Sequence, residues 1–275
     1  MKLARHIFRQ YDIRGIVGED LDAEVAEAVG RAYGSHLRDA VGLATPTVVT
    51  GMDNRTSSPG LSRALVRGLR AVGADVVHVG IVPTPVVYWA ERSLEAHGSV
   101  QITGSHNPSE WNGIKMTVEG RSIYGDTIEG LRDRALEGRL ATGDGGFREV
   151  DVLDDYVADV VGRFDLRRPF HVAVDCGNGT ASVVAVRLLE ALGARVTPLF
   201  CESDGTFPNH HPDPTVDENL EELVRTVRST DAEVGVAFDG DGDRIGVVDG
   251  EGNVVRGDLL LLVFGLDLLR REGPG

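Results

Sequence analysis

Short apolar runs alternate along the chain with longer segments whose apolar residues recur every three or four positions. Apolar runs bounded by Gly, Pro or Asp predict buried strands, and the longer segments predict amphipathic helices. An alternation of the two is typical of α/β proteins. In the first half of the chain the predicted elements are a strand at 47–53, a helix at 59–74, a strand at 75–80, a helix at 84–98 and a strand at 99–104.

A less regular stretch follows as far as residue 147, and a connecting helix is predicted at 152–164. The same order of elements then recurs: a strand and turn at 170–180, a helix at 181–194, a strand at 195–200, a helix at 215–230 and a strand leading into a loop at 232–244. The segment "RAVGADV" matches "EALGARV" when Ala71 is placed on Ala191, 120 residues away. This register favours two tandem copies of one unit, although unrelated strand–helix–strand units also look alike.

We therefore predict an α/β fold with two tandem similar α/β domains, each a mixed sheet packed between helices, plus the start of a third. The first domain is expected at residues 1–150 and the second at 151–253. Residues 254–275 contain a strand end and a helix whose run at 259–263 is too apolar to cover one face of an exposed helix. This helix either packs back on the second domain or begins a third domain whose remainder is absent, and we favour the second interpretation.

The chain has 275 residues and a formal net charge of −15, which disfavours nucleic acid and anionic membranes as partners. An anionic substrate would need positive charge concentrated at one place. Cys176 and Cys201 are too few for a disulfide framework or a zinc site, and the N-terminus lacks the apolar core of a signal peptide. The apolar run at 259–269 is too short to span a membrane. We therefore expect a cytoplasmic protein with no membrane partner.

Two unusual loops follow corresponding predicted strands, one in each copy of the repeat. They are "TGSHNP" at 103–108 and "DGDGDR" at 239–244. Ligand sites of α/β sheets favour the carboxyl ends of strands. We therefore expect the two domains to present these loops to one shared cleft.

The second loop places Asp239, Asp241 and Asp243 at alternate positions with glycine between them. Three carboxylates so close repel one another and need a compensating cation. Hard oxygen ligands suit Mg²⁺ or Ca²⁺, but the EF-hand pattern fails at Arg244 and Gly250, where it needs Gly and Glu. Mg²⁺ fits three ligands on a loop because it keeps positions for water and phosphate. A polar turn is the alternative reading of the loop, and Arg244 is a candidate phosphate ligand.

The first loop places Ser105 beside His106 among turn-forming residues, so it is either a plain turn or a presented nucleophile. Its sequence does not match the G-x-S-x-G motif of α/β-hydrolases. Gly104 permits close backbone approach, and His106 can donate a hydrogen bond or relay a proton. Lys115 follows closely and can act as a base or a phosphate ligand. Upstream loops supply three further candidates for local positive charge: Arg9, Arg14 and Arg55.

Seven segments, in order along the chain, resemble motifs of the α-D-phosphohexomutase superfamily, in particular its phosphomannomutase/phosphoglucomutase branch. They run from Phe8 to Arg244 and therefore cover most of the chain: "FRQYDIRG", "GMDNRTSS", "GIVPTP", "TGSHNP", "WNGIK", "DGTFPNHHPDP" with "ENL", and "DGDGDR". One small departure is Gly104, where many members have alanine, and this difference is expected to be tolerated.

The resemblance implies an isomerase that interconverts hexose 1-phosphate and hexose 6-phosphate through a phosphoserine and a hexose 1,6-bisphosphate. The phosphorylated hexose is then its partner, and Ser105 carries the phosphoryl group. A phosphoserine oxygen and three carboxylates would hold Mg²⁺: those of Ser105, Asp239, Asp241 and Asp243. Four further residues would line the active site: Arg14, His106, Lys115 and Arg244. Among them, Lys115 is the favoured general base and His106 a candidate proton-transfer partner.

Members of this superfamily continue into a third domain with a sugar-recognition loop of the type G-E-x-S-G-H and a fourth with a phosphate-binding loop. Neither is represented in this sequence, so we expect an N-terminal fragment that is weakly active or inactive alone. Two alternatives stay open. One is a Mg²⁺-dependent phosphatase that forms an aspartyl phosphate, and the other is a non-catalytic metal-binding interaction module. An exposed apolar helix at the C-terminal end would also allow self-association.

Overall fold

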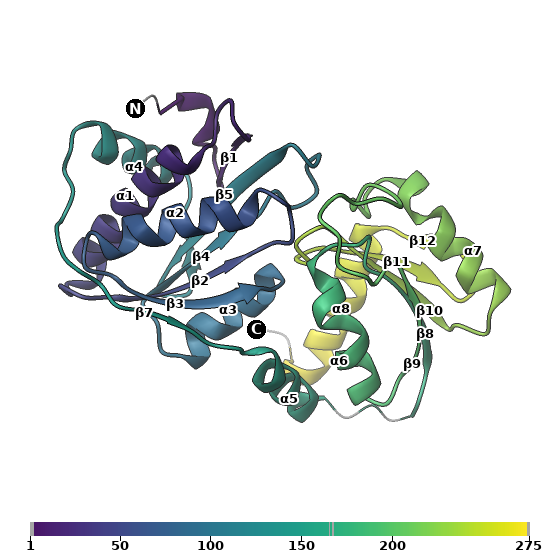
Figure 1. Cartoon of the computed structure of the whole chain (residues 1–275). Coiled ribbons are helices and arrows are strands. Elements are labelled where there is room, and N and C mark those ends of the chain that lie inside the picture. The colour runs from purple at the N-terminus through teal and green to yellow at the C-terminus, as the bar shows by residue number, and fades with distance from the viewer. Residues whose placement is uncertain (1–2, 165, 167, 274–275) are drawn as a thin grey trace.

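The computed structural model describes residues 3–164, 166 and 168–273. These residues form two α/β domains in succession, one around a sheet within residues 13–149 and the other around a sheet within residues 171–255 (Figure 1). Both sheets are mixed, and each lies between helices. The predicted fold class is therefore confirmed.

The first sheet contains seven strands: β1 (Ile13–Ile16), β2 (Thr47–Met52), β3 (Asp75–Ile81), β4 (Gly98–Ile102), β5 (Trp111–Val118), β6 (Arg121–Ser122) and β7 (Phe147–Glu149). Their order is β1-β5-β4-β2-β3-β7, and β6 pairs with β5. β5 is antiparallel to its neighbours, whereas β4, β2, β3 and β7 are parallel. The helices of this half are the 3₁₀ helix η1 (Arg5–Ile7) and the α-helices α1 (Ala23–Val41), α2 (Ser58–Arg70), α3 (Thr84–Ser93) and α4 (Asp126–Leu136).

The second sheet contains five strands: β8 (His171–Asp175), β9 (Arg195–Leu199), β10 (Val234–Phe238), β11 (Ile245–Asp249) and β12 (Val254–Val255). Their order is β12-β11-β10-β8-β9. The helices are α5 (Leu153–Arg163), α6 (Ala185–Ala191), α7 (Glu221–Ser229) and α8 (Gly257–Glu272), with 3₁₀ helices η2 (Thr180–Val183) and η3 (Asp217–Leu220). α5 connects the two halves of the chain.

Four strands are arranged alike in the two sheets. The series β5-β4-β2-β3 corresponds to β11-β10-β8-β9, with the last three strands of each series parallel and the first antiparallel. β4 and β10 are therefore equivalent strands, and the loops at 103–108 and 239–244 follow them. This correspondence agrees with the tandem repeat predicted from the sequence.

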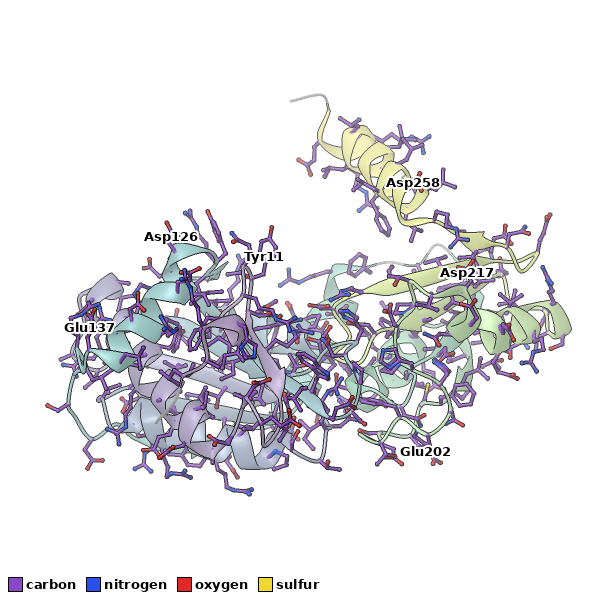
Figure 2. The ribbon with its side chains drawn as sticks, turned by 90° about the horizontal axis from the view of Figure 1, so that it is seen from above. Tyr11, Asp126, Glu137, Glu202, Asp217 and Asp258 are labelled. Carbon is purple, nitrogen blue, oxygen red and sulfur yellow. The ribbon has the colours of Figure 1, made fainter. Side chains whose placement is uncertain are left out.

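α8 projects from the second domain, and none of its side chains is buried among the described residues (Figure 2). Leu261 is 73% exposed and Phe264 is 57% exposed. The alternative in which this helix packs back on the second domain is therefore wrong for the part of the chain that the structure describes. α8, like every other helix within those residues, is too short or too polar to cross a lipid bilayer.

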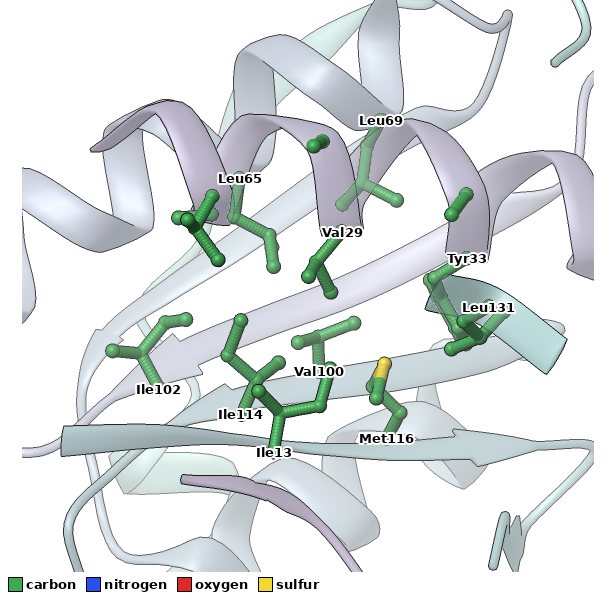
Figure 3. Packing of buried hydrophobic residues seen from close by; sticks show 14 of the residues in the cluster. Ile13, Val29, Tyr33, Leu65, Leu69, Val100, Ile102, Ile114, Met116 and Leu131 are labelled. Atoms are coloured by element: carbon green, nitrogen blue, oxygen red, sulfur yellow. The ribbon is translucent and has the colours of Figure 1, made fainter. Parts of the chain in front are cut away.

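The core of the first domain lies between α1, α2 and the sheet, where Val29 and Leu65 face Val100 of β4 (Figure 3). α1 and α2 approach closely because a glycine lies at their contact. A Cβ atom on Gly30 would be 2.3 Å from the Leu65 carbonyl oxygen. α3 packs on the opposite face of the same sheet. The sheet is thus fixed from both sides, and its strand ends give the loops a rigid support.

Two local predictions are wrong. The stretch between residues 104 and 147, which was predicted to be less regular, contains β5 and α4. β5 includes Asn112, Gly113 and Lys115, which are poor strand formers, but pairing with β1 on one side and β4 on the other overrides that preference. The helix predicted at 181–194 is interrupted at Val184 (φ −142°), where η2 ends and α6 begins. α1 and β1 add two elements before residue 47 that the pattern above does not include.

Candidate active site

The loop after β4 presents Ser105 from a strained backbone. Ser105 has a φ of +49°, in the left-handed region that residues other than glycine seldom adopt. The Ser105 N–H donates to Thr103 Oγ1 at 2.8 Å, and the Gly104 N–H donates to Asp53 Oδ2 at 2.9 Å. These bonds hold a conformation that costs about 1–3 kcal/mol and that is typical of functional sites.

The Ser105 side chain reaches the second domain. Its Oγ donates to Asp239 Oδ2 at 2.8 Å, and it lies 3.3 Å from both His106 Nδ1 and Arg244 Nη2. Ser105 and Asp239 are fully buried. The loops at 103–108 and 239–244 therefore meet directly at the carboxyl ends of equivalent strands.

The three aspartates of the second loop form a compact group of oxygen ligands. One carboxylate oxygen from each of Asp239, Asp241 and Asp243 lies within 4.8 Å of the others. Asp239 Oδ1 accepts the N–H groups of Asp243 and Arg244 at 3.0 and 3.1 Å, which curls the loop around the carboxylate. Asp241 Oδ1 is buried and has no hydrogen-bond partner among the described residues. A buried oxygen without a donor, inside a group of carboxylates, fits a hard divalent cation such as Mg²⁺.

The carboxylates perturb one another strongly. Burial, together with the charges of Asp241 and Asp243, raises the pKa of Asp239 to about 7. Burial also opposes ionisation of Asp241, but the ammonium of Lys115 outweighs it and lowers the pKa of that carboxyl. Burial and the nearby Arg244 lower the pKa of His106. The site therefore carries more negative charge than it can hold without a cation, and its histidine is mainly neutral at pH 7.

Lys115 supplies that cation in this structure. Its Nζ donates to Asp241 Oδ2 at 2.7 Å and to Asp243 Oδ2 at 2.6 Å. Burial alone would lower the pKa of Lys115, but the two carboxylates raise it well above its usual value. Lys115 is therefore protonated and cannot accept a proton while it keeps these partners.

Thr84 also lies at this site, although the sequence predicted no role for it. Its N–H donates to the Asp241 carbonyl oxygen at 2.9 Å, and its hydroxyl donates to Asp241 Oδ2. Thr84 lies at the start of α3 within the segment "GIVPTP", so the motif itself was the only signal in the sequence. Thr84 anchors the loop at 239–244 to the first domain.

A cavity of about 530 Å³ lies beside these residues. Its positively charged or titratable nitrogen-bearing side chains are Arg9, Arg14, His106, Lys115 and Arg244, and its aromatic ones are Tyr11, Tyr88 and Tyr124. Arg14 is held by Asp12 and donates from Nη1 to the Gly104 carbonyl oxygen at 3.0 Å. Asp12 and Asp243 line the cavity as well, so its four arginine and lysine side chains outnumber its carboxylates, as an anionic substrate would need.

Arg55, expected to add to this positive charge, is placed differently. Its side chain is fully buried, and it pairs with Asp53 at 3.1 Å. Its other donors bind four carbonyl oxygens of the loop at 103–108 and the start of β5: those of Ser105 at 2.7 Å, Asn107 at 2.6 Å, Pro108 at 2.6 Å and Trp111 at 3.1 Å. Arg55 is therefore wrong as a candidate for positive charge at the cavity, since its side chain holds the loop at 103–108 from within the first domain. Sequence alone could not distinguish it from a solvated arginine.

The departure at Gly104 is more than a tolerated difference, because the Arg55 guanidinium packs against this glycine. A Cβ atom at position 104 would lie 2.4 Å from Arg55 Cζ and Nε. The guanidinium is held by its carbonyl partners and cannot simply swing away. Glycine at 104 and the buried arginine therefore depend on each other in this chain.

We expect Gly104→Ala to lower the free energy of unfolding by about 1–3 kcal/mol, the usual cost of overpacking a buried site. Gly130→Ala is the matched control, because Gly130 lies in α4 with nothing within 4 Å of an added Cβ. That variant should be neutral or up to about 1 kcal/mol more stable. Urea denaturation measures both, and equal stability of the two variants would contradict the packing role of Gly104.

Magnesium affinity should depend on pH because the pKa of Asp239 is raised to about 7. Below that pH, binding must displace a proton, so the affinity should fall by up to about tenfold for each unit of pH. Above it, the affinity should level off. Calorimetric titration with MgCl₂ between about pH 5.5 and about pH 8.5, in buffers of different ionisation enthalpy, measures both the affinity and the proton released. A flat affinity with no proton release would contradict the raised pKa.

The same shift sets the sign of the pH dependence of stability without metal. Asp239 ionises at a higher pH in the folded protein than in the unfolded chain. The contribution of Asp239 to the free energy of unfolding is therefore present below about pH 4 and is lost as the pH rises through about 7.

Comparison with known proteins matches both halves of the chain to models of one family. The family model described as phosphoglucomutase/phosphomannomutase, alpha/beta/alpha domain I, matches residues 5–141, and the corresponding model of domain II matches residues 154–252. The phosphomannomutase/phosphoglucomutase of Pseudomonas aeruginosa is 46% identical over 273 residues, which are 99% of this chain and 58% of that protein. The phosphoglucomutase of Neisseria meningitidis serogroup B is 42% identical over 99% of this chain and 59% of its own length.

A solved structure of the same family is similar over the whole of this chain. The crystal structure of a phosphoglucomutase/phosphomannomutase family protein from Burkholderia thailandensis superposes with a TM-score of 0.94 at 46% identity, covering 100% of this chain and 61% of that one. The chain thus spans about 58% of the length of the curated relatives it matches.

Proposed function

The chain belongs to the phosphoglucomutase/phosphomannomutase family of the α-D-phosphohexomutase superfamily, and from this we propose that it performs the phosphoryl transfer of a phosphohexomutase. The reaction interconverts hexose 1-phosphate and hexose 6-phosphate through a phosphoserine and a hexose 1,6-bisphosphate. One observation carries the proposal: Ser105 Oγ of the first domain lies 2.8 Å from Asp239 of the carboxylate group in the second domain. A nucleophile and a cation site are thereby brought together.

In the first half-reaction, phosphoserine 105 gives its phosphoryl group to the free hydroxyl of a bound hexose monophosphate. The sugar oxygen forms the new P–O bond and loses its proton, while the bond between phosphorus and Ser105 Oγ breaks. In the second half, Ser105 Oγ forms a bond to the phosphorus at the other end of the bisphosphate, while the bond between that phosphorus and the sugar oxygen breaks and the sugar oxygen takes up a proton. Arg244, 3.3 Å from Ser105 Oγ, is placed to orient the transferring oxygens. Mg²⁺ held by Asp239, Asp241 and Asp243 would act as a Lewis acid on the phosphoryl group.

We assign the proton transfers to His106 and Lys115. His106 lies 3.3 Å from Ser105 Oγ and is mainly neutral at pH 7, so it can take up or return the serine proton. Lys115 can serve as the general base only if its carboxylate partners are neutralised by another charge, since those partners raise its pKa. A cation among the aspartates would remove this obstacle. Arg14, which lines the cavity, would bind the phosphate of the substrate.

Incubation with glucose 1,6-bisphosphate and Mg²⁺, followed by intact-mass and peptide analysis, tests the proposal. We expect one phosphoryl group, stable to hydroxylamine, on Ser105. A phosphatase would instead form a hydroxylamine-labile aspartyl phosphate and release inorganic phosphate. A metal-binding interaction module would remain unmodified. Either result would overturn the mutase assignment.

We further propose that the chain holds phosphate readily but completes few catalytic cycles alone, in line with its coverage of about 58% of the curated relatives. Domain extents of 1–150 and 151–253, with 254–275 as the start of a third domain, belong to the same proposal. The exposed apolar side chains of α8 then form a surface for that third domain or for self-association. Sizing chromatography with light scattering separates a monomer from an assembly.

A further inference from the structure

The two cysteines of the chain, which the proposed phosphoryl transfer does not use, lie side by side in the second domain. Cys176 follows β8 and Cys201 follows β9 by one further residue, and these strands are parallel neighbours with Asp175 paired to Leu199. The Cys176 N–H donates to the Leu199 carbonyl oxygen at 3.1 Å. The two Sγ atoms are 3.0 Å apart. The sulfurs would need to move about 1 Å closer to reach the disulfide bond length of about 2.05 Å.

The two thiols differ in their access to solvent. Cys176 is fully buried, whereas Cys201 is partly exposed. The hydrogen bond that the two sulfurs share lowers the pKa of the Cys201 thiol, and the same bond together with burial raises the pKa of Cys176. Cys201 is therefore the thiol that meets a dissolved oxidant first, and Cys176 is the one placed to react with it afterwards.

We propose that Cys176 and Cys201 are a redox-active pair that hydrogen peroxide converts into an intramolecular disulfide. The Cys201 sulfur attacks one peroxide oxygen, the O–O bond breaks, and the departing hydroxide takes the Cys201 proton as water, which leaves a sulfenic acid. The Cys176 sulfur then attacks the Cys201 sulfur, the S–O bond breaks, and the departing hydroxide takes the Cys176 proton as water. Two thiols are oxidised and one peroxide is reduced to two waters. A dithiol reductant reverses the change by exchange.

Both cysteines are close in sequence to residues that contact the first domain. Asn54 of the first domain donates from Nδ2 to the Asn178 carbonyl oxygen at 2.7 Å and to Ser203 Oγ at 2.9 Å. Each acceptor is two residues beyond one of the cysteines. A bond between Cys176 and Cys201 would therefore fix the spacing of the two loop segments that Asn54 holds together.

The test begins with the fully reduced chain, treated with about two equivalents of hydrogen peroxide and then alkylated. We expect a mass lower by two hydrogens, about 2 Da, no alkylated thiol, and one linked pair of peptides containing Cys176 and Cys201. Reductant should restore two alkylatable thiols. The proposal is overturned if both thiols remain free, if Cys201 proceeds to a sulfinic acid without a link, or if the disulfide joins two chains.

Two variants test the order of reaction. In Cys176→Ala, Cys201 should stop at the sulfenic acid and be trapped by a 1,3-dione probe, whereas in Cys201→Ala the buried Cys176 should stay unmodified. The reverse pattern would overturn the assigned roles. If Cys176→Ala does not fold, limited alkylation of the unaltered chain decides the same point, because Cys201 should react first. None of these readouts depends on phosphoryl transfer.

Discussion

Replacing Ser105 with alanine should abolish transfer of phosphate from glucose 1,6-bisphosphate to the protein, with a loss of rate on the order of 10⁴-fold or more. The serine oxygen is the only atom of that side chain able to form the P–O bond, and it already lies between Asp239, His106 and Arg244. Intact-mass analysis over time, following the gain of about 80 Da for each phosphoryl group, measures the rate.

Ser109→Ala is the matched control, because Ser109 belongs to the same turn-rich segment and is exposed. It should take up phosphate as the unaltered protein does. Phosphorylation of the Ser105→Ala protein at an undiminished rate would exclude Ser105 as the acceptor. Loss of phosphorylation in the Ser109 variant would instead point to a general effect on the loop.

The second large effect is expected from Asp241→Asn, which should weaken Mg²⁺ binding by at least about 100-fold. Asp241 is fully buried, one of its oxygens has no donor among the described residues, and the other is held by Thr84 and Lys115. An amide keeps the shape of the side chain but removes one of three negative charges from the cation site. Calorimetric titration with MgCl₂ at about pH 8, where Asp239 is mainly ionised, measures the affinity.

Asp155→Asn removes the same charge from the exposed surface of α5 and serves as the control. Its Mg²⁺ affinity should remain within about twofold of the unaltered protein, since exposed charges are screened by salt. An equal loss of affinity in both variants would show that net charge, and not the group of three aspartates, attracts the metal. Thermal unfolding without metal shows whether each variant is folded.

The sequence anticipated where the two loops meet because the order of strands and helices along the chain, which apolar periodicity reveals, is the same in both halves. Ser105 and Asp239 follow equivalent strands, and the repeat was enough to predict that both loops face one cleft. β5 was not predicted because its polar residues are strand-forming only between two partners. Arg55 was misread for a related reason: its burial depends on carbonyl groups of residues more than fifty positions away. The partners of Lys115 likewise depend on the second domain.

The contact between the domains at the site has a consequence for how the chain unfolds. Each hydrophobic cluster of the described residues is built on one sheet, and the connecting helix α5 adds Leu153 and Tyr156 to a cluster of the first. The contacts at the site are polar: Ser105 with Asp239, Thr84 with Asp241, and Lys115 with both Asp241 and Asp243. A divalent ion bound there would make the unfolding of one domain costly for the other, because either event releases the ion. Added magnesium should therefore merge two calorimetric transitions into one whose midpoint rises with the logarithm of its concentration. Cooperativity between the domains would then be a property of the bound ion and not of a shared core.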